Sequence, residues 1–273
     1  MTIDAKLQEE LRQQYNPDGS VLRNLQLNLL DILIEFDRIC RKNNIDYWIE
    51  YGTLLGAIRH GGFIPWDDDI DVCVLRKDRK KLIKAINKDL GESYFFIDNV
   101  SKEHYSRCSC GRVLSKKVSL TRYLPDPQGE LTIRRKDNIW LDIGYQINGK
   151  LWMEKTVGYI YGRCFRRRFK VIKDGWKNYL IGSVMYPFAY LLVLMTRAFG
   201  RIFYPKCLIN DLGTNLDSQR YVNDIFPLRE IEFEGHSFKA PKDIDHYLSF
   251  IYRSWRTIPE HKETHPIEDI TFN

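Results

Sequence analysis

Apolar residues recur every three or four positions between Ser20 and Lys42, and this spacing predicts an amphipathic helix. The apolar positions of the pattern are Leu22, Leu25, Leu29, Leu33, Phe36 and Cys40. Ser20 follows the turn sequence Asn-Pro-Asp-Gly at 16–19, and its hydroxyl can accept a hydrogen bond from the first turn of the helix. We therefore expect the helix to begin directly after Ser20.

Shorter apolar runs along the first half of the chain predict strands separated by helices. The expected strands cover residues 45–51, 70–75, 94–97, 107–114 and 139–143, and the expected helices begin at Thr53 and after Asp78. Strands and helices that alternate in this way favour an α/β fold, with flanking helices on a central mixed sheet.

The segment 150–206 has a different pattern, in which basic residues enclose an apolar stretch. Nineteen residues without charge run from Asn178 to Thr196, which is close to the length needed to cross a bilayer. Pro187 lies in the middle of this stretch and is expected to break or kink a helix. We interpret the segment as a pair of membrane-interfacial helices. A helical subdomain buried within the protein and a true membrane span remain alternatives.

Charge is distributed unevenly along the 273 residues. The net charge is +6, but the segment 150–206 carries +10 and residues 207–273 carry −5. A protein that binds nucleic acid is expected to concentrate basic residues around its cleft, so we expect no nucleic-acid partner. The first twenty residues lack an apolar stretch after a basic start, which predicts a cytoplasmic protein without a secretory signal.

The most informative motif is the sequence YGTLLGAIRHGGFIPWDDDIDV at residues 51–72. Asp67, Asp69 and Asp71 alternate along it, so on a strand their carboxylates would leave the same face. Three like charges repel one another unless a cation binds between them, and hard oxygen ligands suit Mg²⁺ or Mn²⁺. An acidic run of this kind can also be a solvated turn.

Gly52 and Thr53 precede the acidic run and suggest a site for an anion. A glycine allows a phosphate to approach the backbone closely, and Thr53 offers a hydroxyl at the start of a helix, where free N–H groups attract anions. An anion site followed by metal-binding carboxylates is the arrangement of a nucleotidyltransferase.

The motif resembles the signature of the LicD family, which includes bacterial phosphocholine transferases and fukutin-related proteins. Weaker resemblances are the sequence NIWLDIGYQ at 138–146, similar to the family's second acidic strand, and residues 226–252, similar to its C-terminal segment. The chain departs from the family where many members have Tyr-Gly-Asp: residues 251–255 read Ile-Tyr-Arg-Ser-Trp.

The resemblance implies a nucleotidyltransferase-like fold and transfer of a phosphorylated alcohol from a CDP-activated donor to a glycan. Asp69 and Asp71 would be catalytic and hold the metal ion, and Asp67 would hold a second ion or position the first. Asp142, on the second acidic strand, would act as the base or as a further metal ligand.

Four further residues are candidates for binding the substrate. Arg59 would clamp phosphate through its planar guanidinium, and Arg112 is a second phosphate candidate by position. His60 could donate to phosphate or cap a turn, and Trp66 could stack on cytosine, contact a quaternary ammonium group or lie in the core. Arg59 could instead be a helix-end charge.

We therefore expect a catalytic core at 1–149, a basic helical segment at 150–206 that contacts the membrane, and a segment at 207–273 that completes the catalytic domain. The expected reaction transfers phosphocholine from CDP-choline to a cell-surface or lipid-linked glycan, of the teichoic acid or lipopolysaccharide type, at the inner face of a bacterial membrane. The alternatives are transfer of ribitol or glycerol phosphate, a true nucleotidyltransferase that releases pyrophosphate, and a catalytically silent membrane adaptor.

Overall fold

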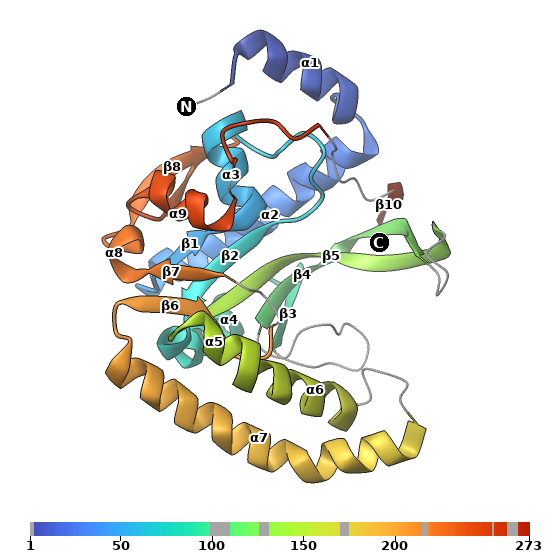
Figure 1. Ribbon diagram of the computed structural model, residues 1–273. Helices are drawn as coiled ribbons and strands as arrows, with labels where there is room; N and C mark the ends of the chain where they lie inside the picture. The colour runs from blue at the N-terminus through green and yellow to red at the C-terminus, as the bar shows by residue number, and fades with distance from the viewer. Residues whose placement is uncertain are drawn as a thin grey trace.

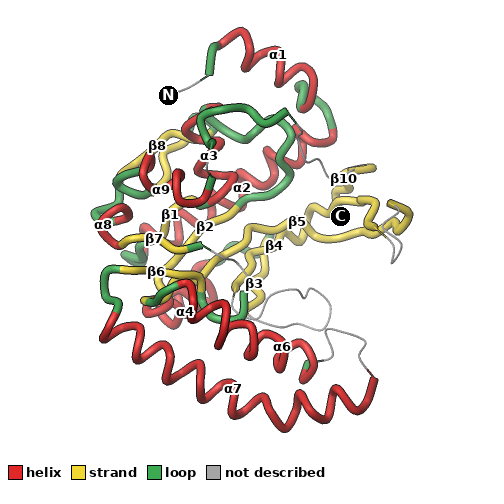
Figure 2. Tube along the Cα trace, in the orientation of Figure 1, coloured by secondary structure: helices red, strands yellow, loops and turns green. Residues whose placement is uncertain are grey.

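An eight-stranded mixed sheet lies at the centre of the computed structural model, and helices pack around it (Figure 1). The structure describes residues 3–98, 110–125, 131–169, 175–214, 218–252, 254–260 and 267–273. Figure 2 shows how the strands gather in the middle of the molecule, with helices above and below them in that view.

Strands β1, β2, β5, β4 and β10 follow one another across the sheet, while β3 pairs with β4, and β6 pairs with both β5 and β7. Only β2 and β5 are parallel among these described pairs. The strands of this sheet are β1 (Tyr47–Ile49), β2 (Asp71–Leu75), β3 (Tyr94–Asp98), β4 (Cys110–Pro125), β5 (Leu131–Asn148), β6 (Cys207–Asn210), β7 (Gln219–Tyr221) and β10 (Ile267–Phe272). A separate hairpin consists of β8 (Arg229–Phe233) and β9 (His236–Ala240).

The described helices connect and cover these strands. They are α1 (Ala5–Tyr15), α2 (Val21–Lys42), α3 (Tyr51–His60), the 3₁₀ turn η1 (Arg76–Asp78), α4 (Arg79–Asp89), α5 (Leu151–Met153), the π-helical turn η2 (Glu154–Gly158), α6 (Tyr159–Arg168), α7 (Gly175–Phe203), α8 (Val222–Ile225) and α9 (Ile244–Ile251). This architecture confirms the predicted α/β class with a central mixed sheet.

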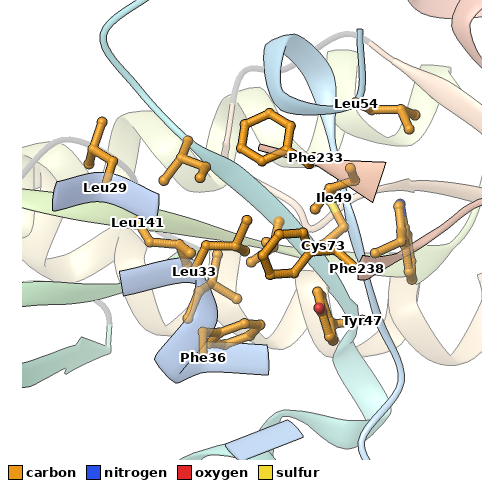
Figure 3. Close-up of a cluster of buried hydrophobic side chains, with 14 of the residues drawn as sticks. Leu29, Leu33, Phe36, Tyr47, Ile49, Leu54, Cys73, Leu141, Phe233 and Phe238 are labelled. Atoms are coloured by element: carbon orange, nitrogen blue, oxygen red, sulfur yellow. The ribbon is translucent and has the colours of Figure 1, made fainter. Parts of the chain in front are cut away.

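Helix α2 forms as predicted and supplies much of the core. The Ser20 hydroxyl accepts a hydrogen bond from the Arg23 N–H at 3.1 Å, which confirms the N-cap. The buried face of α2 packs on the sheet and belongs to the same cluster as Phe233 and Phe238 of the β8–β9 hairpin, and Figure 3 shows Leu29 and Leu33 beside Leu141. The C-terminal segment thus shares one hydrophobic core with the first half of the chain.

Helices α6 and α7 bury a second, smaller cluster against the end of the sheet. It includes Met153, Val157, Tyr161, Phe165, Ala189, Val193, Ile209 and Leu212. Helix α7 continues through Pro187, so of the expected break or kink the break is wrong. The missing N–H of a proline removes one hydrogen bond, and the packing of α7 along α6 outweighs that loss here.

Strands β4 and β5 are much longer than the sequence pattern predicts. The expected strand at 139–143 is the centre of an 18-residue strand that begins at Leu131. Its first part reads LTIRRKDN, and this charged sequence lacks the apolar alternation of a half-buried strand. In Figure 1 the β4–β5 hairpin forms the far end of the sheet, where β10 pairs with β4.

Candidate active site

Two aspartates from separate sequence motifs lie side by side on parallel strands. Asp71 begins β2 and Asp142 lies within β5, and the two are register partners. Partnered residues point to the same face of a sheet, from strands about 4.8 Å apart. The neighbouring Leu141 belongs to the core beside α2, so the two carboxylates leave the opposite face. This parallel pair of carboxylates is the centre of the candidate site.

Backbone hydrogen bonds fix the positions of both aspartates. The Asp71 N–H donates to the Thr53 hydroxyl at 2.9 Å, and the Asp71 carbonyl accepts from the Glu50 N–H at 3.0 Å. The Asp142 N–H donates to the Ile70 carbonyl at 3.0 Å. Thr53 is buried, and its hydrogen bond with Asp71 connects the first turn of α3 to β2. Its contact with a substrate phosphate stays a prediction.

Asp67 and Asp69 lie in the acidic loop, residues 67–70, which leads into β2. Of the three alternating aspartates only Asp71 is part of the strand, and the side chains of Asp67 and Asp69 hydrogen-bond to each other. Burial, together with the charge of Asp69, raises the pKa of Asp67 well above its usual range. A cation bound at the loop would favour the ionised form of these adjacent carboxylates.

Gly52 allows this acidic loop to approach α3. A Cβ atom at residue 52 would lie only 2.6 Å from Asp67 Oδ2, so any larger residue would push the carboxylate away. The sequence suggested that Gly52 makes room for a phosphate. In the structure, the space above its Cα is occupied by Asp67.

Gln26 holds the acidic loop against α2, a role that the sequence analysis did not identify. This residue is fully buried on α2, and its Nε2 donates to the Asp67 carbonyl at 2.9 Å. Its Oε1 accepts from Asn16 Nδ2 at 2.7 Å. A polar residue within the apolar stripe of an amphipathic helix was the only signal for this role.

Asp142 is oriented by two donors from neighbouring positions. Arg112 Nε donates to Asp142 Oδ1 at 2.7 Å, and Trp140 Nε1 donates to Asp142 Oδ2 at 3.1 Å. The Arg112 guanidinium also lies over the Trp140 ring, 4.5 Å from its centre. The sequence suggested Arg112 as a phosphate ligand, and the structure places its positive charge at the candidate base or metal ligand.

Arg59 joins α3 to the C-terminal segment. Its side chain is 3% exposed, and its NH1 group donates to the carbonyls of Trp255 and Thr257 at 3.2 and 3.1 Å. A contact with phosphate would require Arg59 to leave these carbonyls. The described geometry thus gives Arg59 a structural role that the predicted phosphate clamp did not include.

Trp66 packs edge-on against Tyr15 and His60, with ring centres 5.4 and 5.9 Å apart. It is buried, so the structure places it at the core position that the sequence left open as one alternative. Stacking on cytosine would need the ring to be accessible. Trp66 instead holds α3 close to α1.

His60 accepts from Arg59 Nε at 2.9 Å through Nε2, and its Nδ1 lies 2.6 Å from Gln8 Oε1. Because Nε2 accepts, Nδ1 carries the proton and the ring is neutral. Burial and the nearby Arg59 charge lower the pKa of His60 to about 3. His60 thus acts as a neutral bridge between α3 and α1.

The low pKa of His60 predicts a pH-dependent stability. Between pH 6.5 and 3 the unfolded chain binds a proton here that the folded chain does not, so stability should fall as the pH falls. From pH 7.5 to 5 we expect the wild type to lose about 2 kcal/mol more than a His60→Gln variant. Urea unfolding of both proteins at the two pH values measures the difference, and equal losses would contradict the assignment.

A buried polar network joins the site to the C-terminal segment. Arg220, on β7, donates to the Glu50 carboxylate, and the Tyr247 hydroxyl donates to the same carboxylate. Trp48 Nε1 also donates to Glu50 Oε2, at 2.7 Å. All four residues are at most 1% exposed. The Glu50 N–H donates to the Asp71 carbonyl, so the network connects directly to the backbone of Asp71.

The charges in this network stabilise one another. Burial alone would lower the pKa of Arg220, but the charge of Glu50 overrides that effect and raises it well above its usual range. Burial also raises the pKa of Tyr247 well above its usual range, so its hydroxyl stays protonated and donates. The network is therefore an ion pair between Glu50 and Arg220 with two neutral donors, Tyr247 and Trp48.

Tyr252 also faces this region, from the segment where the chain departs from the family pattern. Burial raises its pKa, and the charges of Glu50, Asp67 and Asp71 raise it further. The residue follows α9 directly. Tyr252 is thus a further candidate residue of the site, which the sequence motifs did not identify.

The carboxylates fit an incomplete rather than a closed metal site. Among the described residues, no group of three or more His, Cys, Asp or Glu side chains is placed to enclose a metal ion. Mg²⁺ is usually held by one or two carboxylates together with substrate phosphates, and Asp71 and Asp142 place two carboxylates side by side on one face of the sheet. The residues present thus fit an ion that arrives with its substrate.

Comparison with known proteins finds a family model that matches this part of the chain. Residues 44–142 match a family model described as LicD/FKTN/FKRP, nucleotidyltransferase domain. The matched range begins just before β1 and ends at Asp142, so it includes α3, the acidic loop and β2.

Relatives match over different lengths. The chain is 27% identical over 267 residues to the lipopolysaccharide cholinephosphotransferase LicD of Haemophilus influenzae, which covers 90% of this chain and 95% of that protein. It is 53% identical over 34 residues to the human ribitol 5-phosphate transferase FKRP, or 12% of this chain and 7% of that protein. A terminal uridylyl transferase 4 structure from Trypanosoma brucei with bound GTP aligns at 14% identity over 61% of this chain and 44% of that one. Its TM-score of 0.26 is too low to bear on the fold.

Proposed function

Because the chain belongs to the LicD family, we propose that it transfers phosphocholine from CDP-choline to a hydroxyl of a cell-surface or lipid-linked glycan. The observation that carries the proposal is the register pairing of Asp71 with Asp142 beside the acidic loop. Support for the product comes from the similarity to a lipopolysaccharide cholinephosphotransferase along nearly the whole chain. A lipopolysaccharide or teichoic acid type of acceptor is consistent with that similarity.

In the proposed reaction the acceptor oxygen forms a bond to the phosphorus of phosphocholine, and the bond from that phosphorus to CMP breaks. Asp142 takes the proton of the acceptor hydroxyl, while Arg112 and Trp140 hold the carboxylate in place. Asp69 and Asp71, with Asp67 and Asp142 beside them, are the residues that would hold Mg²⁺ or Mn²⁺. Such an ion supplies charge neutralisation on the donor phosphates and the departing CMP.

Transfer of ribitol phosphate is a second candidate. The short match to human FKRP, a ribitol 5-phosphate transferase, favours it. A CDP-alcohol donor is common to both candidates, and the two differ in the group that follows the second phosphate. The pocket for that group therefore decides between them.

Calorimetric titration with CDP-choline, CDP-ribitol and CDP-glycerol, each with and without Mg²⁺, tests the proposal. We expect CDP-choline to bind most tightly and to lose at least about tenfold in affinity without Mg²⁺, because the acidic loop repels the donor phosphates. The Asp71→Asn variant should lose the Mg²⁺ dependence. Preference for another donor would change the product and keep the reaction type, whereas no binding of any donor would overturn the proposal.

We also place the reaction at the inner face of a bacterial cell membrane, because a lipid-linked acceptor is found there. Among the described residues, helix α7 is long and apolar enough to cross a membrane by length and composition. How α7 would do so depends on its packing.

A further inference from the structure

Helix α7 packs against the protein through its small residues and exposes its large apolar ones. The residues that it buries are Gly182, Ala189, Val193, Thr196 and Gly200. They recur every three to seven positions and form one narrow stripe along the helix. An ordinary surface helix of a soluble protein has the opposite arrangement, with its large apolar residues inside.

The outward face of α7 is an extended apolar surface. Its exposed large apolar residues are Trp176, Leu180, Ile181, Val184, Met185, Phe188, Tyr190, Leu191, Leu192, Leu194, Met195, Phe199, Ile202 and Phe203. The 29 residues of α7 extend over about 43 Å. Soluble monomers rarely expose a contiguous apolar surface of this size, so the surface is expected to have a partner.

Both ends of α7 are held against the protein. A Cβ atom at Gly182 would lie 2.4 Å from the Cβ of Arg167 on α6, and one at Gly200 would lie 2.1 Å from the Asn148 carbonyl at the end of β5. These approaches are close enough to require glycine. Helix α7 consequently lies along the molecule, as Figure 1 shows, and does not project from it.

A buried ion cluster reinforces this attachment. Arg197 on α7 donates twice to Asp211, at 2.9 and 2.8 Å, and Arg76 after β2 donates to the same carboxylate at 2.7 Å. The side chain of Asp211 is 1% exposed. Pulling α7 away would leave this carboxylate buried without part of its charge compensation, which is costly. The helix is therefore fixed in the orientation that exposes its apolar face.

The charges around this face favour an anionic surface as its partner. Helix α7 contains no acidic residue, and its exposed charged residues are Lys177 near the first turn and Arg201 in the last. Arg163 on α6 and Lys206 directly after α7 are also exposed and basic. Cations beside a long apolar helix match the headgroups and acyl chains of an anionic bilayer.

We propose that α7 is an in-plane membrane anchor that inserts its outward face into the acyl region of an anionic bilayer, with Lys177 and Arg201 at the headgroups. The anchor does not span the membrane, because its other face remains packed on α6 and β5. Asn148, beside Gly200, is six residues from Asp142 on β5, or at most about 20 Å along the strand. The anchored protein would thus hold the candidate site near the membrane surface.

Vesicle flotation tests the anchor without any measurement of turnover, so its failure is distinct from failure of the proposed function. The probes are vesicles of phosphatidylcholine mixed with phosphatidylglycerol, and vesicles of phosphatidylcholine alone. The wild-type chain should float with the mixed vesicles, less with the neutral ones, and less at high salt.

A Phe188→Glu/Met195→Glu variant should lower binding to the mixed vesicles at least about tenfold, because two large apolar side chains no longer enter the bilayer. Phe272→Glu on β10 is the matched control, since Phe272 is 68% exposed and Phe188 is 65% exposed. All three positions are on the surface, so the variants should fold like the wild type. The control should bind vesicles as well as the wild-type protein does.

Three outcomes would overturn the proposal. The first is no vesicle binding by the wild-type protein, and the second is an equal loss in the control variant. The third is retention of wild-type protein in the vesicles after an alkaline carbonate wash, which would indicate a spanning helix. A dimer in light scattering that is lost in the Phe188→Glu/Met195→Glu variant, without vesicle binding, would assign the face to a second copy of the chain.

Discussion

The Asp71→Asn variant should lower kcat at least about a thousandfold, or about 4 kcal/mol of transition-state stabilisation, and should leave the fold intact. The amide has the size of the carboxylate but lacks its charge, so it cannot offset a cation between the donor phosphates. The hydrogen bond that holds residue 71 to Thr53 uses the backbone N–H and survives the change. CMP released from CDP-choline, with Mg²⁺ and a lipopolysaccharide acceptor, measures the effect.

Asp46→Asn is the matched control for this variant. Asp46 precedes β1, is 57% exposed and pairs only loosely with Lys239, at 3.2 Å. The same change in charge at this position should leave kcat within about a factor of two, because exposed ion pairs contribute little. If Asp71→Asn retained more than a tenth of the wild-type activity, the charge of Asp71 would not be essential and the site would have to rest on other residues.

Local patterns in the sequence predicted the elements that local interactions determine. The apolar period of α2 and the cap at Ser20 depend on residues within one or two turns, so both appear in the structure as expected. The acidic motif likewise predicted the start of β2 to within one residue, since the expected strand begins at residue 70 and the observed one at Asp71. Helix α7 differs because its continuation through Pro187 depends on packing against α6, which no local pattern contains.

The sequence suggested which residues belong to the candidate site, but only part of their arrangement in space. The aspartates of the acidic motif and Asp142 were identified from the sequence, but the position of Asp71 beside Asp142 comes from the parallel pairing of β2 with β5. The partners of Arg59, Arg112 and Trp66 could not be read from the sequence, because a side chain that could bind a ligand can equally bind the protein itself. Carbonyls of residues 255 and 257 are nearly two hundred residues from Arg59.

The second large effect is expected at the ion pair between Glu50 and Arg220. Glu50→Gln or Arg220→Met should each lower the free energy of unfolding by about 3–5 kcal/mol, because each leaves a fully buried charge without its partner. Urea unfolding measures these losses, provided that the slope against urea concentration stays the same in all variants. The Lys239→Met variant, which breaks the exposed pair with Asp46, should cost less than about 1 kcal/mol.

The double variant Glu50→Gln/Arg220→Met distinguishes an ion pair from two independent packing positions. Once both charges are absent, neither leaves the other uncompensated, so the double variant should lose clearly less stability than the two single losses together. Additive losses would contradict the ion pair as the source of the effect. The Glu50 backbone holds the Asp71 carbonyl whichever side chain it carries. Turnover of the folded double variant should therefore stay close to that of the wild type, because the backbone contact with Asp71 is kept.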